Sequence, residues 1–150
     1  MKRRIVKHAF VKAFLLALIP FMVFAATANT GVDTYSIYLN KKLLIKQSMD
    51  KPLMLQSLHL DKASPNDELI IYYNQCNAPN KIGRGRSIIV KDAEGKKIKE
   101  WKFEDVKGSN QAMIIPVKEL IDLQNKKTAS SLVLFYYAEN PGREQMLASL

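Results

Sequence analysis

The stretch that decides the fold runs from Asp67 to Val90 and reads DELIIYYNQCNAPNKIGRGRSIIV. It opens with an apolar run, Leu69 to Tyr73, and closes with a second one, Ser87 to Val90. Runs of β-branched and aromatic residues bounded by turn residues are typical of β-strands. The stretch therefore predicts two strands of a sheet joined by a long polar connection.

This polar connection is the best site candidate in the sequence. Long ordered loops on a rigid scaffold often carry function. Glycines allow close backbone approach to a ligand, and two arginines can grip a carboxylate, sulfate or phosphate in a forked geometry. We predict a ligand-binding group that consists of Asn74, Cys76, Lys81, Gly83, Arg84, Gly85 and Arg86.

If this group is a site, the guanidinium groups of Arg84 and Arg86 should converge on one exposed pocket. Replacing both with Ala should then leave stability nearly unchanged. The alternative is a solvated basic turn that deters pairing at a sheet edge. The string lacks the Lys-Ser/Thr and following helix of a phosphate-binding P-loop, so it does not imply nucleotide binding.

The N-terminal residues have the order of a secretory signal peptide. Five basic residues precede Ala13 without any acid, an apolar segment runs to Phe24, and small residues follow up to Ala28. This order predicts cleavage after Ala28, with Ala25 as the alternative position. A permanent anchor is the competing interpretation, but the apolar segment is shorter than the about 20 residues that span a bilayer. We expect residues 1–28 to be removed and the product to be secreted or periplasmic.

Export changes the charge of the working protein. Without the five leader residues, the 23 basic residues of the chain become 18, against 14 acidic ones, a net charge near +4 instead of +9. Such a charge is ordinary for a soluble domain and is not the footprint of a nucleic-acid binder. Residues 29–150 are enough for one domain, and we expect no membrane span after cleavage.

Two strands and a turn are predicted before the central stretch. Residues 34–48 alternate in period two, with Asn40-Lys41 as a tight turn, which indicates a hairpin with one buried face. Residues 50–60 fit either a short helix or strand pieces. We favour a strand over Gln56 to Asp61, because the turn cluster 62–67 follows it.

A clear hairpin follows the polar connection. Its strands are residues 87–91 and 96–104, and Gly95 in the turn can adopt a left-handed conformation. The parity of the return strand changes between Ile98 and Trp101, which indicates a bulge near Lys99-Glu100 or burial on both faces. This strand-Asp-x-x-Gly-strand unit resembles hairpins in immunoglobulin-like modules of secreted proteins.

The C-terminal third alternates between strands and one helix. We predict strands over residues 112–115, 132–137 and 144–150, and a helix from Pro116 to Lys126 with apolar side chains at helical spacing. The runs 69–73 and 133–137 both end in Tyr-Tyr, which indicates two central strands in similar positions. About eight strands and one crossover helix predict an antiparallel, immunoglobulin-like β-sandwich. One sheet with the helix across a face is the alternative.

The chemistry of single residues is weakly specified. Cys76 could be a nucleophile with His59 as its base, but the sequence does not show that they meet. No Cys-x-x-Cys spacing and no metal-ligand spacing are present, so we expect no cofactor. The aromatic residues that could line a binding face are Tyr38, Tyr72, Tyr73, Trp101, Tyr136 and Tyr137. One member of each Tyr-Tyr pair should point to the core.

These features predict an exported, non-enzymatic interaction module that binds a protein or glycan partner, or an anionic group, through loops at one sandwich end. The partner would lie in the envelope or outside the cell, and nucleic acid is not expected. Two alternatives remain: a thiol-dependent enzyme that uses Cys76, and a structural component of the cell envelope.

Overall fold

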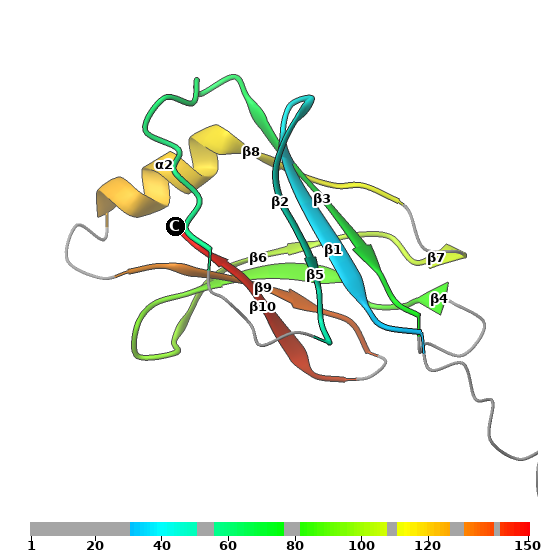
Figure 1. Cartoon of the computed structure of the whole chain (residues 1–150). Helices are drawn as coiled ribbons and strands as arrows, with labels where there is room; N and C mark the ends of the chain where they lie inside the picture. The colour runs from blue at the N-terminus through cyan, green and yellow to red at the C-terminus, as the bar shows by residue number, and fades with distance from the viewer. Residues whose placement is uncertain (1–30, 51–55, 77–81, 108–110, 127–130, 140–141) are drawn as a thin grey trace, which may run out of the picture. The chain divides into compact units, whose positions relative to one another are not determined.

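The computed structural model describes residues 31–50, 56–76, 82–107, 111–126, 131–139 and 142–150. Residues 31–150 form a compact unit. The predicted signal peptide lies outside the described residues. In its described residues the compact unit is mainly β, with two antiparallel sheets of four strands, a small two-stranded sheet and one short helix (Figure 1).

Sheet 1 has the strand order β2-β1-β3-β8. Its strands are β2 (Lys42–Ser48), β1 (Thr34–Leu39), β3 (Glu68–Asn74) and β8 (Met113–Pro116). All adjacent strands in this sheet pair antiparallel. The predicted hairpin over 34–48 is confirmed, and Asn40 in its turn has a φ of 53°, a conformation that Asn tolerates better than most residues.

Sheet 2 has the strand order β10-β9-β5-β6. Its strands are β10 (Glu144–Ser149), β9 (Val133–Tyr137), β5 (Ser87–Lys91) and β6 (Lys97–Lys102). The register between β5 and β6 shifts so that Ile98 has no partner on β5. The predicted bulge is therefore present, one residue before the predicted position.

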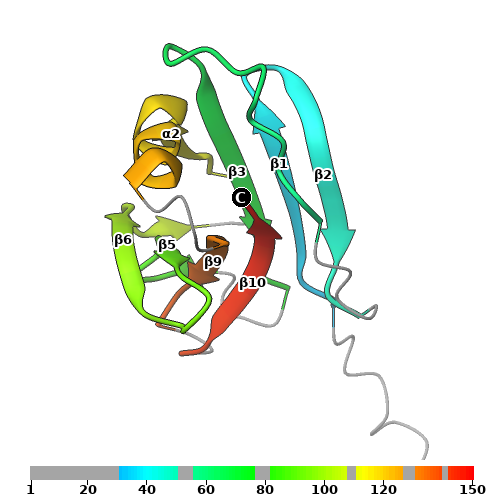
Figure 2. The same cartoon turned by 90° about the vertical axis from the view of Figure 1, so that its left-hand side faces the viewer.

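The order of strands within and between the sheets is that of a Greek-key sandwich. β3 and β8 are neighbours in one sheet, and β10, β9, β5 and β6 follow one another in the other. In immunoglobulin domains, strands B and E are neighbours as β3 and β8 are here, and strands G, F, C and C′ follow one another as β10, β9, β5 and β6 do. The predicted β-sandwich is thus confirmed, and two views at right angles show its two layers (Figures 1 and 2).

The helix α2 (Val117–Lys126) connects β8 of sheet 1 with β9 of sheet 2, as a crossover should. It begins one residue later than predicted, because Pro116 still pairs with Glu68 as the last residue of β8. Glu119 in its first turn accepts a hydrogen bond from Trp101 Nε1 at 3.0 Å. It also forms an ion pair with Lys99 at 3.1 Å. These contacts fix the helix to β6, beside the gap between the sheets (Figure 2).

The predicted strand over 56–61 is wrong. Only Ser57 forms a β-bridge, to Ser149, and this bridge is parallel. The alternation that suggested a strand is real, because Leu58 and Leu60 are buried and His59 is exposed. The chain runs extended beside the edge of β10, but a turn at residue 60 ends the contact before a ladder forms. The segment covers the side of the sandwich opposite to α2 (Figure 2).

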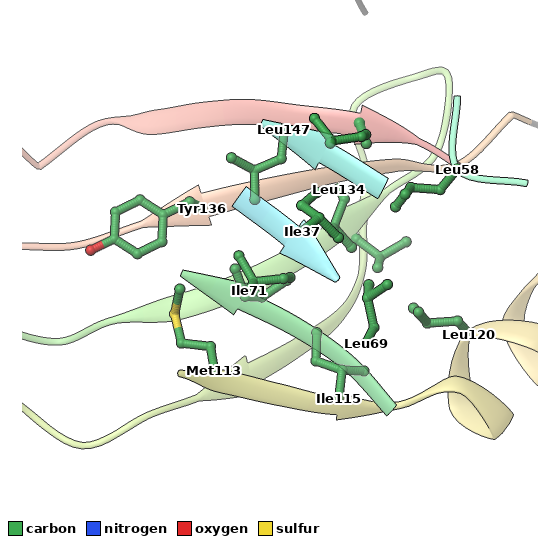
Figure 3. Close-up of a cluster of buried hydrophobic side chains, with 14 of the residues drawn as sticks. Ile37, Leu58, Leu69, Ile71, Met113, Ile115, Leu120, Leu134, Tyr136 and Leu147 are labelled. Atoms are coloured by element: carbon green, nitrogen blue, oxygen red, sulfur yellow. The ribbon is translucent and has the colours of Figure 1, made fainter. Parts of the chain in front are cut away.

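The core lies between the two sheets (Figure 3). Side chains of the central strands β3 and β9 alternate between core and surface, as the two Tyr-Tyr runs predicted. Tyr73 and Tyr136 point inward, and their rings stack 3.9 Å apart across the interface. Tyr72 and Tyr137 are half-buried on the outer faces. The prediction of one inward and one outward tyrosine in each pair is confirmed.

Candidate functional site

The polar connection folds back onto the sandwich after β3. Its second half forms the short strand β4 (Ile82–Gly83), which pairs with β7 (Val106–Lys107) in a separate two-stranded sheet. Of the predicted site residues, Lys81 lies outside the described residues. Asn74 is the half-buried last residue of β3 and is paired with Thr34 on β1.

Arg86 is an internal residue with a structural role. Its side chain is 4% exposed, and its guanidinium group donates to Glu104 O at 3.0 and 3.1 Å and to Gln111 O at 3.1 Å. Its stem lies over Gly83, where an added Cβ would come within 2.7 Å of Arg86 Cδ. Burial lowers the pKa of Arg86, although a guanidinium stays charged in proteins. Arg86 therefore ties the β4 and β7 segments together.

Arg84 differs from Arg86 because it is exposed. The backbone around it is fixed, since Arg84 O accepts the Glu139 N–H at 3.0 Å and the Gly85 N–H donates to Asp105 Oδ1 at 2.8 Å. Gly85 has a φ of +56°, and a Cβ there would meet Glu139 Cγ at 2.6 Å. The expected convergence of two guanidinium groups on one exposed pocket is thus not formed. Arg84 alone stays available as a ligand-binding arginine.

Cys76 is held at the end of β3 by the segment that leads into β1. Its N–H donates to Asp33 Oδ1 at 2.9 Å, and its side chain lies against Gly31. The other oxygen of Asp33 accepts the hydroxyl of Tyr73 at 3.2 Å. Burial, followed by the nearby Asp33 charge, raises the pKa of Tyr73 far above its ordinary value. Asp33 therefore anchors this end of the sandwich from within.

Cys76 and His59 lie toward opposite ends of the fold. His59 follows Leu58, whose N–H donates to Ser149 O at the end of β10. Cys76 comes three residues after Tyr73, which stacks on Tyr136, and Tyr136 pairs with the second residue of β10. On β10, the residue that pairs with Tyr136 and Ser149 are four residues apart, which is roughly 13 Å at about 3.3 Å per residue. The fold therefore does not bring the cysteine and the histidine together.

Burial also raises the pKa of Tyr136, to about 12. Its ring belongs to the core, and its hydroxyl points away from the aliphatic side chains (Figure 3). Tyr73 and Tyr136 are therefore not members of an exposed aromatic surface. Among the predicted aromatic candidates, Tyr38 and Tyr72 lie together on the outer surface of sheet 1, with ring centroids 5.8 Å apart.

We call the outer surface of sheet 1 the apolar face. Its members are the outward residues Ser36, Tyr38, Leu43, Lys46, Ile70, Tyr72 and Ile114, which alternate along their strands with core residues. A row of apolar side chains, one from each strand, crosses its centre. In this row Tyr38 lies opposite Leu43 on one side and Ile70 on the other. Ile70 lies opposite Ile114.

The apolar row is open to solvent at both of its ends. Leu43 on the edge strand β2 is 45% exposed, and Ile114 on the edge strand β8 is 46% exposed. Val32 is the third large hydrophobic residue that is exposed in the described part of the chain. All three belong to sheet 1 or to the segment that leads into it. Scattered exposed apolar residues are normal, but a contiguous group marks an interaction surface.

The outer surface of sheet 2, which we call the charged face, is built differently. Its outward residues are Ser87, Ile89, Lys91, Lys97, Glu100, Lys102, Val133, Phe135, Tyr137, Glu144, Met146 and Ser149. Lys91 lies 5.3 Å from the ring centroid of Phe135 and forms an ion pair with Glu144. A second pair joins Lys97 and Glu100 at 2.8 Å. Ile89 lies at the centre of this face, between Glu100 and Phe135 on the neighbouring strands, and is only 4% exposed.

Comparisons with protein-family models, with curated proteins and with solved structures found no match to this chain. Within the described ranges, no helix has the length and apolar character needed to cross a membrane. The same ranges contain no group of three or more His, Cys, Asp or Glu side chains arranged to hold a metal ion. The apolar face, together with exposed Arg84, is what the described residues offer for binding.

Sequence reasoning identified Tyr38 and Tyr72 but missed Leu43, Ile70 and Ile114 as members of the same surface. The available signal was that the runs 69–73 and 113–115 are apolar at successive positions. Such a strand has apolar side chains on both faces. The position of these residues in one row depends on strand pairing, which their own sequence does not specify.

Proposed function

We propose that this chain acts as an exported, non-enzymatic interaction module that binds a protein partner through the apolar face. The observation that carries the proposal is the apolar row across four strands, with Leu43 and Ile114 nearly half exposed. Burying a fully exposed aliphatic side chain contributes about 1.5–3 kcal/mol. The remaining exposed area of the row therefore represents a few kcal/mol that only a partner can supply.

The geometry of the face supports a protein in preference to a glycan. Sugars stack on flat, open aromatic rings, whereas Tyr38 and Tyr72 meet at an interplanar angle of 86°, edge to face. The apolar residues lie in the middle of strands and present a flat sheet surface. A second sheet or a helix complements such a surface through shape and buried apolar area.

The proposal also fits the described surroundings of Cys76. An enzyme that uses this thiol needs a base within hydrogen-bond reach, and His59 lies toward the other end of the sandwich. Arg86 supports the loop from inside, and of the two loop arginines only Arg84 is exposed. The apolar face is therefore a better binding surface than the loop.

Photo-crosslinking in the cells that make the protein tests the proposal. Benzoylphenylalanine replaces Ile114 on the apolar face in one variant and Lys102 on the charged face in a matched control, since both side chains are exposed. We expect a protein adduct of discrete mass from position 114 and none of that mass from position 102. An absence of adduct at 114, or identical adducts from both positions, would contradict the proposal.

A further inference from the structure

We infer that the partner docks acidic side chains beside an apolar contact, with its carboxylates on the lysines of the β1–β2 hairpin. This inference rests on the proposed function and specifies the chemistry of the partner at the same face. Its basis is the distribution of charge around the apolar row.

The hairpin is basic without any internal compensation. Between Asp33 and Asp50 the chain contains three lysines and no acidic residue. These lysines are Lys41, Lys42 and Lys46, and all three are exposed. Ion pairs found within the described residues use Lys91, Lys97, Lys99 and Lys118. The hairpin lysines thus differ from those of the charged face, where Lys91 and Lys97 are paired within the domain.

The lysines border the apolar row on its β2 side. Lys46 faces outward opposite Ser36, and Ser36 in turn lies opposite Tyr72. Lys41 and Lys42 lie in and directly after the turn that precedes Leu43. The acid in contact with the turn is Asp67, whose Oδ1 accepts a hydrogen bond from Asn40 Nδ2 at 2.9 Å. Lys42 pairs with Leu39, whose side chain packs against the core, so Lys42 points to the other side of β2 from Leu43. A partner that covers Leu43 therefore meets Lys46 and comes beside Lys41, and carboxylates are the complement of these ammonium groups.

A second copy of this chain is a poorer occupant. Two apolar faces in contact would bring together Lys41 and Lys46 of both copies, four ammonium groups, whereas Glu68 at the rim of the face would contribute two carboxylates. Like charges brought close together at an interface oppose association. A heterologous partner with an acidic contact surface has no such excess of one sign.

An anionic lipid surface is also disfavoured. Its headgroups would match the lysines, but the exposed apolar residues lie within the flat sheet and not at loop tips, so they cannot insert among acyl chains without the sheet. Glu68, which is hydrogen-bonded to Asn40 in the hairpin turn, would face the same headgroups. A protein surface can place different charges at these two positions.

Zero-length carbodiimide coupling tests the inference, because it joins an amine only to a carboxylate in contact with it. The wild-type chain is coupled in the producing cells, and the joined peptides are identified by mass spectrometry. We expect Lys41, Lys42 or Lys46 to be joined to Asp or Glu of a different protein, the same one that is captured from position 114. Joined peptides from two copies of this chain, or an adduct without peptide, would overturn the inference.

A triple variant gives an independent measurement of the same charge. With benzoylphenylalanine at position 114, changing Lys41, Lys42 and Lys46 to Gln should lower the adduct yield about five- to tenfold at low salt. The loss should shrink as salt rises, because exposed charges are screened over about 8 Å at physiological ionic strength. The control changes Lys96, Lys97 and Lys102 to Gln, an equal change in charge on sheet 2, and should keep the yield.

The outcomes separate the inference from the proposed function. If the adduct at 114 persists with an unchanged yield in the triple variant, and the hairpin lysines are not coupled, the face binds a protein but the acidic chemistry is wrong. If position 114 gives no adduct at all, the proposed function itself fails.

Discussion

The two outer faces of the sandwich contain the same kinds of apolar residue but differ in how far these side chains are exposed to solvent. On the charged face, Ile89 lies at the centre, between Glu100 and Phe135 on the neighbouring strands, and is 4% exposed. On the apolar face, Ile70 on the inner strand β3 is half-buried, and Ile114 on the edge strand β8 is 46% exposed. The nearby lysines of that face form no ion pair within the described residues.

This difference follows from where the charged side chains lie on each face. Long charged side chains cover apolar surface with their stems while their heads stay in water. Lys91 does so over Phe135 and is held in place by Glu144. The lysines of the β1–β2 hairpin lie beside the apolar row instead of across it. Charged side chains therefore cover part of the charged face in the isolated domain, whereas the apolar face keeps exposed apolar side chains on its two edge strands.

The comparison of the two faces would say nothing about binding if the polar connection with Arg84 and Arg86, and not the apolar face, bound the partner. Arg86→Ala should lower the free energy of unfolding by about 3 kcal/mol, because it removes a buried charge and its bonds to Glu104 O and Gln111 O. Arg84→Ala should change it by less than about 0.5 kcal/mol. Urea unfolding measures both, and the crosslinked yield from position 114 should be unchanged in Arg84→Ala. A strong loss of that yield would move the binding site to the loop.

A matched pair of isoleucines tests the difference in burial. Ile89→Ala should destabilise the domain by about 2 kcal/mol, at the lower end for a buried isoleucine because its surroundings are flexible side chains. Ile114→Ala should cost less than about 1 kcal/mol, mainly through β-propensity. The midpoints of urea unfolding at constant slope measure the two effects. Equal losses would show that the apolar face is as well covered as the charged face.

A matched pair of lysines tests the covering itself. Lys91→Ala should cost about 1 kcal/mol, because it removes both the contact with Phe135 and the ion pair with Glu144. Lys46→Ala should have no measurable effect on the isolated domain. Thermal and urea unfolding at low and high salt check this, and the cost of Lys91→Ala should decrease with salt. A larger cost for Lys46→Ala would reverse the assignment of the two faces.

The smallest predicted effect is a pH dependence of the charged face. The hydrogen bond from Lys97 lowers the pKa of Glu100 below its ordinary value of 4.5. The folded state therefore favours the carboxylate, and this contribution is present above the ordinary pKa and is lost as the pH falls through the folded pKa. We expect a contribution below about 1 kcal/mol, because the pair is partly exposed. Unfolding of wild type and Glu100→Gln should differ at pH 6 and converge near pH 3, and a constant difference would contradict this cause.

Much of the fold could be predicted because its signals are local. The period-two pattern of residues 34–48, the turn at Asn40 and the Gly95 turn of the β5–β6 hairpin lie within single hairpins. The two Tyr-Tyr runs identified the central strands. The prediction of a strand over 56–61 was wrong although Leu58 and Leu60 alternate as in a strand. A strand also needs a continuous ladder of hydrogen bonds, and the partner here, Ser149, lies about 90 residues later in the chain.

The site was less predictable because it depends on contacts between distant segments. Arg86 has the same parity as Ile88 and Val90, whose side chains face the core, so its inward direction could have been read from period two. The carbonyl groups of Glu104 and Gln111, which accept hydrogen bonds from the buried guanidinium group, could not be predicted from the sequence. Likewise, the apolar face combines residues from four strands, and their register arises only in the folded sheet.

The most direct test of the account measures folding and partner capture on one double variant. Leu43→Ser and Ile114→Ser are combined, and benzoylphenylalanine is placed at Ser36 on the same face. The account predicts a free energy of unfolding within about 1 kcal/mol of the parent that carries only the crosslinker, together with loss of the adduct in the producing cells. An undiminished adduct from the folded double variant would contradict the claim that the apolar face binds the partner.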